Sequence, residues 1–179
     1  CNTFWGDGGL LAGDNTDVAG LTAAIGVLDV PAGPWLILGT GGSARAAVAA
    51  AAAAGVAVHI RSRDAARGEA FARWALTLGV PRAAAAECVL LCNATPAGLD
   101  PAGPLPPMPE PRSAAAAGLD LVYCRGETPW VQALRARGLR ADDGRTMLVG
   151  QGAVAFERWW PGIPAPVDVM RRAVDDALG

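Results

Sequence analysis

Short apolar runs alternate with longer alanine-rich or amphipathic stretches through the middle of the chain. The apolar runs predict strands that are buried on both faces, at residues 35–38, 56–60, 88–92 and 119–123. The stretches that follow three of these runs predict helices, over residues 43–55, 64–78 and 128–138. Such strand–helix alternation is typical of an α/β fold with a doubly wound, mostly parallel sheet, the Rossmann-like arrangement.

The beginning of the chain departs from this alternation. Residues 1–12 predict a hairpin, because two extended segments flank a glycine-rich turn. Thr16 or Asp17 is expected to cap a helix that continues to about Leu28.

The second half of the chain contains two further departures. Six prolines between Pro101 and Pro111 predict a stiff connection on the surface. Residues 140–179 predict helices, with a break at residues 159–162, where Trp-Trp-Pro-Gly interrupts the helical pattern.

Composition narrows the class of protein. The chain has 179 residues with 52% hydrophobic and 18% charged side chains, which excludes an intrinsically disordered chain. A net charge of −2 without a basic cluster argues against nucleic-acid binding. The most membrane-like stretch, residues 46–58, is too short to span a membrane and is broken by Gly55. All 15 basic residues are arginine, so the chain contains no lysine for acid–base or Schiff-base chemistry.

The cysteines predict no disulfide framework, because four of them are scattered over the whole chain. We interpret Cys88 and Cys92 as buried thiols beside a strand rather than as metal ligands, since His59 is the only histidine. His59 itself lies in a strand pattern and is expected to be a packing residue. Without a recognisable signal peptide, we expect the reducing environment of the cytoplasm.

The segment Gly39-Thr40-Gly41-Gly42-Ser43-Ala44 lies between a predicted buried strand and a predicted helix. Glycines allow the backbone to approach a pyrophosphate closely, and the helix N-terminus supplies free N–H groups and a partial positive charge. This context favours a dinucleotide-binding turn. The alternative is a tight turn in an unrelated α/β protein.

The end of the second predicted strand indicates which dinucleotide would fit. An NAD site usually has a carboxylate there, whereas this chain has Arg61-Ser62-Arg63, with Arg67 one turn later. Guanidinium groups suit a 2′-phosphate, which favours NADP. We expect Asp64 to cap the next helix through its backbone amides. The alternative is that these arginines form a solvated face.

Six motifs in a fixed order carry a family resemblance. They are Asn2-Thr3, Gly13-Asp14-Asn15-Thr16-Asp17, Gly39-Thr40-Gly41-Gly42, Asn93-Ala94-Thr95-Pro96-Ala97-Gly98, Asp120-Leu121-Val122-Tyr123 and Gly150-Gln151-Gly152. Together they resemble the shikimate dehydrogenase family, essentially from end to end of the chain. The resemblance implies reduction of 3-dehydroshikimate to shikimate with NADPH, in a cleft between a substrate domain and a nucleotide domain.

The resemblance also implies roles for individual residues. The residues implied to face the substrate, with Asp17 also catalytic, are Asn2, Asp17, Tyr123 and Gln151. Those implied to hold the pyrophosphate are Gly39, Thr40, Gly41, Gly42 and Ser43, and those at the 2′-phosphate are Ser62, Arg63 and Arg67. Those implied near the nicotinamide are Thr95, Leu121, Gly144 and Met147. Plainer interpretations stay open: Asp17 as a helix cap, Tyr123 as a core aromatic, and Gln151 as part of a glycine-flanked turn.

The family pairs a lysine of its substrate domain with the aspartate that matches Asp17. Because this chain has no lysine, the resemblance implies that the N-terminal substrate domain is absent from it. We expect residues 1–20 to be the end of that domain and a hinge, 21–148 the dinucleotide-binding domain, and 149–179 helices that return towards the substrate domain. Such a chain is expected to bind cofactor without turning over substrate.

Two other functions remain open at this stage. One is an NAD-dependent quinate/shikimate dehydrogenase, which cofactor preference would distinguish. The other is a non-catalytic nucleotide-binding regulatory module that never had a lysine partner. In each case the expected partner is a small molecule rather than a nucleic acid or a membrane, and the oligomeric state, including a homodimer, stays open.

Overall fold

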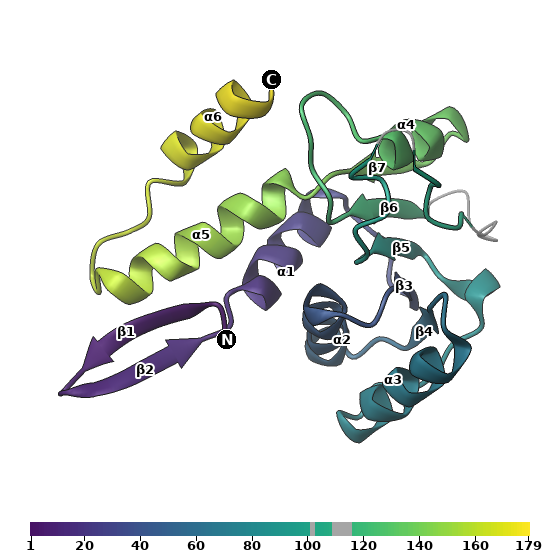
Figure 1. Cartoon of the computed structure of the whole chain (residues 1–179), viewed down its shortest axis with the longest axis horizontal. Coiled ribbons are helices and arrows are strands. Elements are labelled where there is room, and N and C mark those ends of the chain that lie inside the picture. The colour runs from purple at the N-terminus through teal and green to yellow at the C-terminus, as the bar shows by residue number, and fades with distance from the viewer. Residues whose placement is uncertain (101–102, 109–115) are drawn as a thin grey trace.

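Five parallel strands form the central sheet of the computed structural model, which describes residues 1–100, 103–108 and 116–179 (Figure 1). In spatial order the strands are β4 (Val58–Arg61), β3 (Trp35–Leu38), β5 (Leu90–Asn93), β6 (Ala117–Asp120) and β7 (Arg140–Asp142). Every neighbouring pair is parallel. The chain order reverses between β3 and β5, and α/β sheets bind ligands outside the carboxyl ends of such strands. The predicted doubly wound α/β fold is confirmed.

Helices cover both faces of the sheet because alternate strand residues point to opposite sides. The helices are α1 (Asp17–Val27), α2 (Gly42–Ala54), α3 (Ala65–Thr77), α4 (Pro129–Ala136), α5 (Arg145–Trp159) and α6 (Val167–Leu178), with a 3₁₀ turn at Ala85–Glu87. Trp35 and Ile37 of β3 belong to a core with residues of α1, α2 and α5. Leu36 and Leu38 belong to a second core with α4, around the fully buried Trp130. Burial on both faces explains why this strand is apolar at every position.

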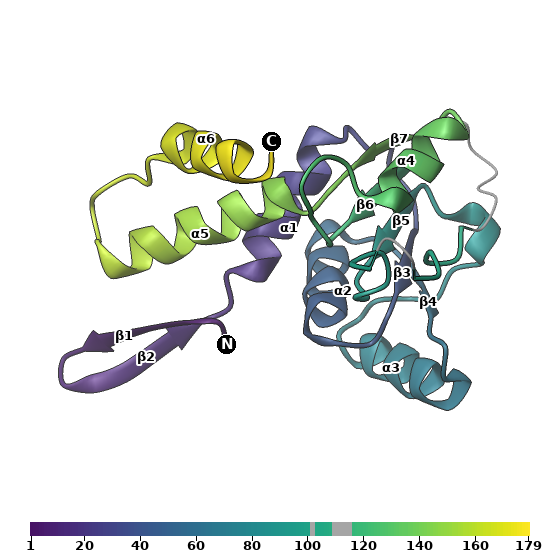
Figure 2. The same cartoon turned by 45° about the horizontal axis from the view of Figure 1, so that its top comes forward.

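A separate unit of secondary structure lies beside the sheet (Figures 1 and 2). Strands β1 (Thr3–Asp7) and β2 (Leu10–Asp14) pair as an antiparallel hairpin. The C-terminal half of α5 approaches this hairpin, and α6 runs beside α5. Helices α1 and α5 cross closely at two glycines. A Cβ atom on Gly20 would lie 2.5 Å from the Met147 carbonyl oxygen, and one on Gly150 would lie 2.9 Å from the Gly20 Cα. This crossing ties the hairpin unit to the sheet.

The predicted helix ends agree with the structure. Gly55 ends α2 in the left-handed region with φ +66°, as expected for a residue without a Cβ. The Asp64 carboxylate accepts a bond from the Arg67 N–H at the start of α3, and the Thr128 hydroxyl does the same for the Val131 N–H in α4. Helix α5 ends at Trp159, which confirms the predicted break before α6.

Several predicted strand positions are wrong by about two residues. The strand expected at residues 119–123 is β6, which ends at Asp120 because the Asp120 carboxylate takes the Val122 N–H out of the ladder. The strand expected at 88–92 is β5, which begins later because the Cys88 N–H bonds to Ala85 in the preceding 3₁₀ turn. The edge strand β7 was not predicted, since its sequence Arg-Ala-Asp has no apolar run.

The structure describes only part of the predicted proline-rich connection. Pro101, Pro109 and Pro111 of the expected stiff connection lie outside the described residues, whereas Pro104, Pro106 and Pro107 lie in neither helix nor strand. Within the described ranges, no helix is long and apolar enough to cross a membrane.

Candidate active site

The turn after β3 lies at the carboxyl edge of the sheet, where the strand order reverses. Its first residue, Gly39, has φ +111°, and its N–H donates to the Arg61 carbonyl at the end of β4 over 2.9 Å. A Cβ atom on Gly39 would lie 2.7 Å from the Ala94 carbonyl oxygen, just after β5. Backbone conformation and close packing therefore both require glycine here. The turn is held between the ends of β4 and β5.

Gly41 and Gly42 differ from Gly39 because no contact among the described residues requires glycine at either position. A Cβ atom on either would have no heavy atom of those residues within 4 Å, and Gly41 has an ordinary φ of −84°. Gly41 is the N-cap of α2 and supplies no side chain to bond the first-turn N–H groups. The result is an open surface of backbone donors at a helix N-terminus, which fits the pyrophosphate of a dinucleotide.

Three arginines lie at and after the end of β4, where the Arg61 carbonyl accepts from the Gly39 N–H of this turn. Arg61, Arg63 and Arg67 are exposed, and none forms an ion pair or side-chain hydrogen bond within the part of the chain that the structure describes. Asp64 between them is engaged as the predicted N-cap, and the Ser62 hydroxyl accepts from the Asp64 N–H over 3.3 Å. The guanidinium groups are therefore free to bind an anion, and a 2′-phosphate matches their planar donors.

A buried polar network joins the ends of β5 and β6. The Asn93 side-chain amide donates to the Asp120 carboxylate over 2.7 Å, and the Thr128 hydroxyl donates to the other carboxylate oxygen over 2.8 Å. All three side chains have no exposed surface. Burial raises the pKa of the Asp120 carboxyl, while the hydrogen bonds from Thr128, Asn93 and the Val122 N–H act in the opposite direction.

This network positions Thr95 and Leu121, two of the residues expected beside the nicotinamide. The Asn93 side-chain oxygen accepts from both the N–H and the hydroxyl of Thr95, over 3.1 and 2.7 Å. The Asn93 carbonyl accepts from the Leu121 N–H over 3.0 Å. Sequence reasoning quoted Asn93 and Asp120 within motifs but assigned them no role. A polar residue at the last position of a fully buried strand was the signal available.

The other two residues expected near the nicotinamide lie on α5 or at its start. Gly144 precedes α5, and a Cβ atom there would lie 2.5 Å from the Leu121 carbonyl oxygen and 3.2 Å from the Tyr123 ring. Met147 is buried one turn later, and its carbonyl faces Gly20 of α1. Thr95 and Leu121 are thus linked through Asn93, Gly144 adjoins the Leu121 carbonyl, and Met147 belongs to the core against which Leu121 packs.

Two of the expected substrate residues are in direct contact. The Asn2 side-chain amide donates to the Asp17 carboxylate over 2.7 Å, while the Asn2 oxygen accepts from the Thr16 N–H over 3.0 Å. Asp17 is the first residue of α1 and does not cap it. The Asn15 side chain accepts from the Asp17 N–H instead, and Thr16 makes no side-chain cap bond. Thr16 is therefore the N-cap by position, as predicted, but neither Thr16 nor Asp17 caps the helix through its side chain.

Of the other two substrate candidates, Gln151 lies on α5 and Tyr123 lies beside its start. Gln151 lies within α5 rather than in a turn, and its N–H would be 2.8 Å from a Cβ atom on Gly20, one turn along α1 from Asp17. Tyr123 is 40% exposed beside Gly144, so it is not a core aromatic. Asn2, Asp17 and Gln151 thus gather where α1 meets α5, and Tyr123 lies at the sheet end of α5.

The thiols and the histidine take no part in this arrangement. Cys88 and Cys92 are buried as predicted, and burial raises the pKa of these thiols to about 11 and about 12. The Nδ1 atom of His59 lies 3.1 Å from the Ala83 carbonyl oxygen, at the outer edge of β4.

Comparison with known proteins gives three consistent likenesses. Residues 144–174 match the family model described as the shikimate 5′-dehydrogenase C-terminal domain. The chain is 40% identical to a shikimate dehydrogenase (NADP(+)) of Thermus thermophilus over 174 residues, which are 96% of this chain and 65% of that protein. It is 37% identical to the corresponding protein of Halobacterium salinarum over 179 residues, which are 97% of this chain and 67% of that protein.

A solved structure gives the same result in three dimensions. The shikimate 5-dehydrogenase of Thermus thermophilus, crystallised with NADP(H) and shikimate, superposes with a TM-score of 0.84 at 36% sequence identity. The superposition covers 98% of this chain and 67% of that protein. The chain therefore spans about two thirds of the length of the relatives that it matches, and 65% of the Thermus sequence.

Proposed function

The chain belongs to the shikimate dehydrogenase family, and we propose that the complete protein reduces 3-dehydroshikimate to shikimate with NADPH. The observation that carries the proposal is the edge of the sheet between β4 and β5. There an open glycine turn adjoins arginines that no carboxylate neutralises within the described ranges. The proposal is supported by relatives that are named as NADP-dependent enzymes.

This chain would supply the cofactor side of the reaction. The backbone of residues 39–43 would hold the pyrophosphate at the N-terminus of α2, and Ser62, Arg63 and Arg67 would surround the 2′-phosphate. Thr95, Leu121, Gly144 and Met147 would line the nicotinamide end. When bound, NADPH supplies the hydride that reduces the substrate ketone to a hydroxyl group. The polar network of Asn93 and Asp120 would keep Thr95 and Leu121 in place for that step.

The residues Asn2, Asp17, Gln151 and Tyr123 would orient the substrate. Paired amide and carboxylate groups suit a polyhydroxylated ring, because each can bond neighbouring hydroxyls. Reduction of a ketone also consumes a proton, and this chain has no lysine to deliver it. We infer that residues outside the chain supply the lysine and that the Asp17 carboxylate, partly exposed at the start of α1, orients it.

The same proposal covers the arrangement of the protein. Residues 1–20 would end the substrate domain and form a hinge, residues 21–148 would form the dinucleotide-binding domain, and residues 149–179 would return towards the substrate domain. The enzyme would work in the cytoplasm on a small-molecule substrate, without nucleic acid or membrane, and a homodimer is one arrangement open to it.

A spectrophotometric assay of the complete protein tests the proposal. Shikimate with NADP⁺ should produce NADPH absorbance, and both NAD⁺ and quinate should give much lower kcat/KM. Preference for NAD⁺ with quinate would instead favour a quinate/shikimate dehydrogenase. Nucleotide binding without turnover of either substrate would favour a regulatory module and overturn the proposal.

A further inference from the structure

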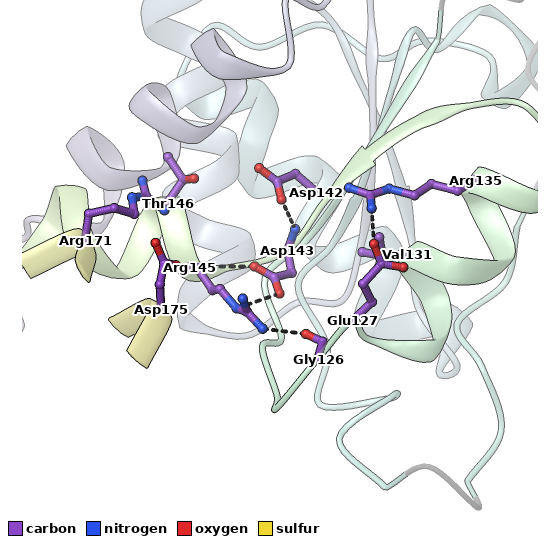
Figure 3. A pocket seen from close by; sticks show the side chains of 10 residues that line it. All are labelled: Gly126, Glu127, Val131, Arg135, Asp142, Asp143, Arg145, Thr146, Arg171 and Asp175. Carbon is purple, nitrogen blue, oxygen red and sulfur yellow. Dashed lines mark hydrogen bonds and ion pairs between the residues drawn. The ribbon is translucent and has the colours of Figure 1, made fainter. Parts of the chain in front are cut away.

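Arg145, the first residue of α5, connects separate segments of the chain, and Figure 3 shows its contacts with Gly126 and Asp143. Its Nη2 atom donates to the carbonyl oxygens of Cys124 at 3.0 Å and Leu178 at 3.4 Å, and also to that of Gly126. Its Nε atom lies 3.2 Å from the Asp143 carboxylate, and only 20% of the Arg145 side chain is exposed. These contacts border a cavity of about 250 Å³ between α4, α5 and α6.

The segment that Arg145 holds directly follows Tyr123. Residues 122–128 form neither helix nor strand, so tertiary contacts must fix their course. Within the described ranges, the backbone hydrogen bonds of residues 123–126 run only to the Arg145 side chain and to the Leu178 carbonyl, which accepts from the Gly126 N–H over 2.9 Å. The two ends of the segment are fixed separately, at Val122 by Asp120 and at Thr128 by the same carboxylate.

We propose that Arg145 is a positioning residue for Tyr123, acting by tying residues 124–126 to the end of α6. The role of Tyr123 at the substrate rests on the proposed function. One planar guanidinium can serve several carbonyls and a carboxylate at once, whereas a lysine ammonium on a flexible stem cannot hold the same set in a fixed geometry. The end of α6 thereby becomes part of the support of the site, through the Leu178 carbonyl.

Arg135 provides a matched control in the same cavity. Its Nε and Nη2 atoms donate to the Ala141 carbonyl over 3.1 and 2.7 Å, and its Nη1 atom pairs with Glu127. Arg135 therefore also donates to a backbone carbonyl and pairs with a carboxylate, but within the described ranges it forms no hydrogen bond with residues 123–126. If Arg145 contributed to stability alone, substitutions of Arg145 and Arg135 should have similar effects on kcat/KM.

A double-mutant cycle in the complete protein tests the proposal. Arg145→Met and Arg145→Lys should each lower kcat/KM for shikimate at least about tenfold, because small displacements of positioning groups are costly. Arg145→Lys keeps a charge beside Asp143 in case the methionine variant does not fold. In a Tyr123→Phe background the same substitutions should cost less than about twofold, as expected for residues that act through one another. Arg135→Met should change kcat/KM less than about twofold in both backgrounds.

Equal losses of kcat/KM in the parent and in the Tyr123→Phe background would overturn the proposal, since Arg145 would then act independently of the Tyr123 hydroxyl. Hydrogen exchange distinguishes this failure from a failure of the proposed function. In a protein with no shikimate turnover, the Gly126 amide should still exchange at least about tenfold faster in Arg145→Met than in the parent or Arg135→Met. Unchanged exchange at Gly126 would contradict the tie itself, whatever the activity.

Discussion

The proposed cofactor side and the proposed substrate side of this site are assembled in different ways. The glycine turn takes its residues from positions 39–44, and the arginines beside it follow the next strand along the chain. The substrate candidates Asn2, Asp17 and Gln151 come from opposite ends of the chain and meet only because α1 crosses α5 at Gly20 and Gly150. The cofactor side is therefore built on a rigid sheet, whereas the substrate side depends on one helix crossing and a hairpin.

This difference predicts different responses to substitution. Groups on the cofactor side should affect affinity and discrimination between dinucleotides, because they are in place before any substrate binds. Groups on the substrate side should affect turnover, because they act at the reacting centre. Residues that support the strand ends should affect both through stability.

The largest effect is expected for Asp17→Asn in the complete protein. The substitution keeps the shape and the oxygen that accepts from Asn2 but removes the charge, so kcat should fall by about 10²–10⁴-fold. Thermal stability should stay unchanged, since Asp17 does not cap α1. Asp14→Asn, which alters the neighbouring carboxylate that pairs with Arg158, is the control and should leave kcat within about twofold. A near-normal kcat for Asp17→Asn would remove the residue from the catalytic side.

Asp120→Ala should give the largest loss of stability. The Asn93 amide, the Thr128 hydroxyl and the Val122 N–H would all lose their acceptor inside the protein, at a cost of about 3 kcal/mol in the free energy of unfolding. Denaturant titration measures this loss. Asp176→Ala, at an exposed position of α6, should change stability by less than about 0.5 kcal/mol. Similar values for the two variants would contradict the supporting role of the network.

Arg63→Ala should weaken NADPH binding by about 1.5–3 kcal/mol and leave NADH binding unchanged. A charge-assisted contact with the 2′-phosphate has about this strength, and NADH lacks the phosphate. Arg73→Ala removes an exposed arginine within α3, further along the chain than Arg63, and should affect the binding of neither cofactor. Calorimetry that found equal losses for NADPH and NADH would show that Arg63 is part of a solvated face.

Gly41→Ala should have the smallest effect and should act on binding alone. The added methyl group meets nothing in the protein and φ is ordinary, so stability should change by less than about 1 kcal/mol. NADPH affinity should nevertheless fall about tenfold, because the methyl group would occupy space needed by the pyrophosphate. Gly39→Ala is the informative contrast, since its Cβ would clash with the Ala94 carbonyl and destabilise the fold itself. Unchanged NADPH affinity in Gly41→Ala would place the cofactor elsewhere.

The same contrast explains how much the sequence could predict. Local signals such as Gly55, Asp64 and Thr128 marked helix ends correctly, because each acts on backbone groups within a few residues. The glycine turn and its arginines were recognisable for the same reason. Strand bounds were shifted because Asp120 ends β6 through its own side chain, which apolar periodicity does not reveal.

Contacts between residues far apart in the chain leave weaker signals in the sequence than helix caps and turns do. The resemblance named Asn2, Asp17 and Gln151, but only the structure shows the Asn2–Asp17 bond and places Gln151 within a helix. The tie from Arg145 to Cys124 and Leu178 joins positions 21 and 33 residues apart, and no pattern of charge or hydrophobicity marks it. Such contacts depend on the packing of whole elements, so they cannot be deduced from neighbouring residues.

Calorimetric titration of this chain with NADPH and with NADH tests the central claim most directly. All residues proposed for the cofactor side lie within the chain, so NADPH should bind saturably to one site and at least about tenfold more tightly than NADH. The same preparation should show no oxidation of shikimate, because the chain has no lysine to exchange the proton. Absence of saturable NADPH binding by the folded chain, or equal affinity for the two cofactors, would contradict the account.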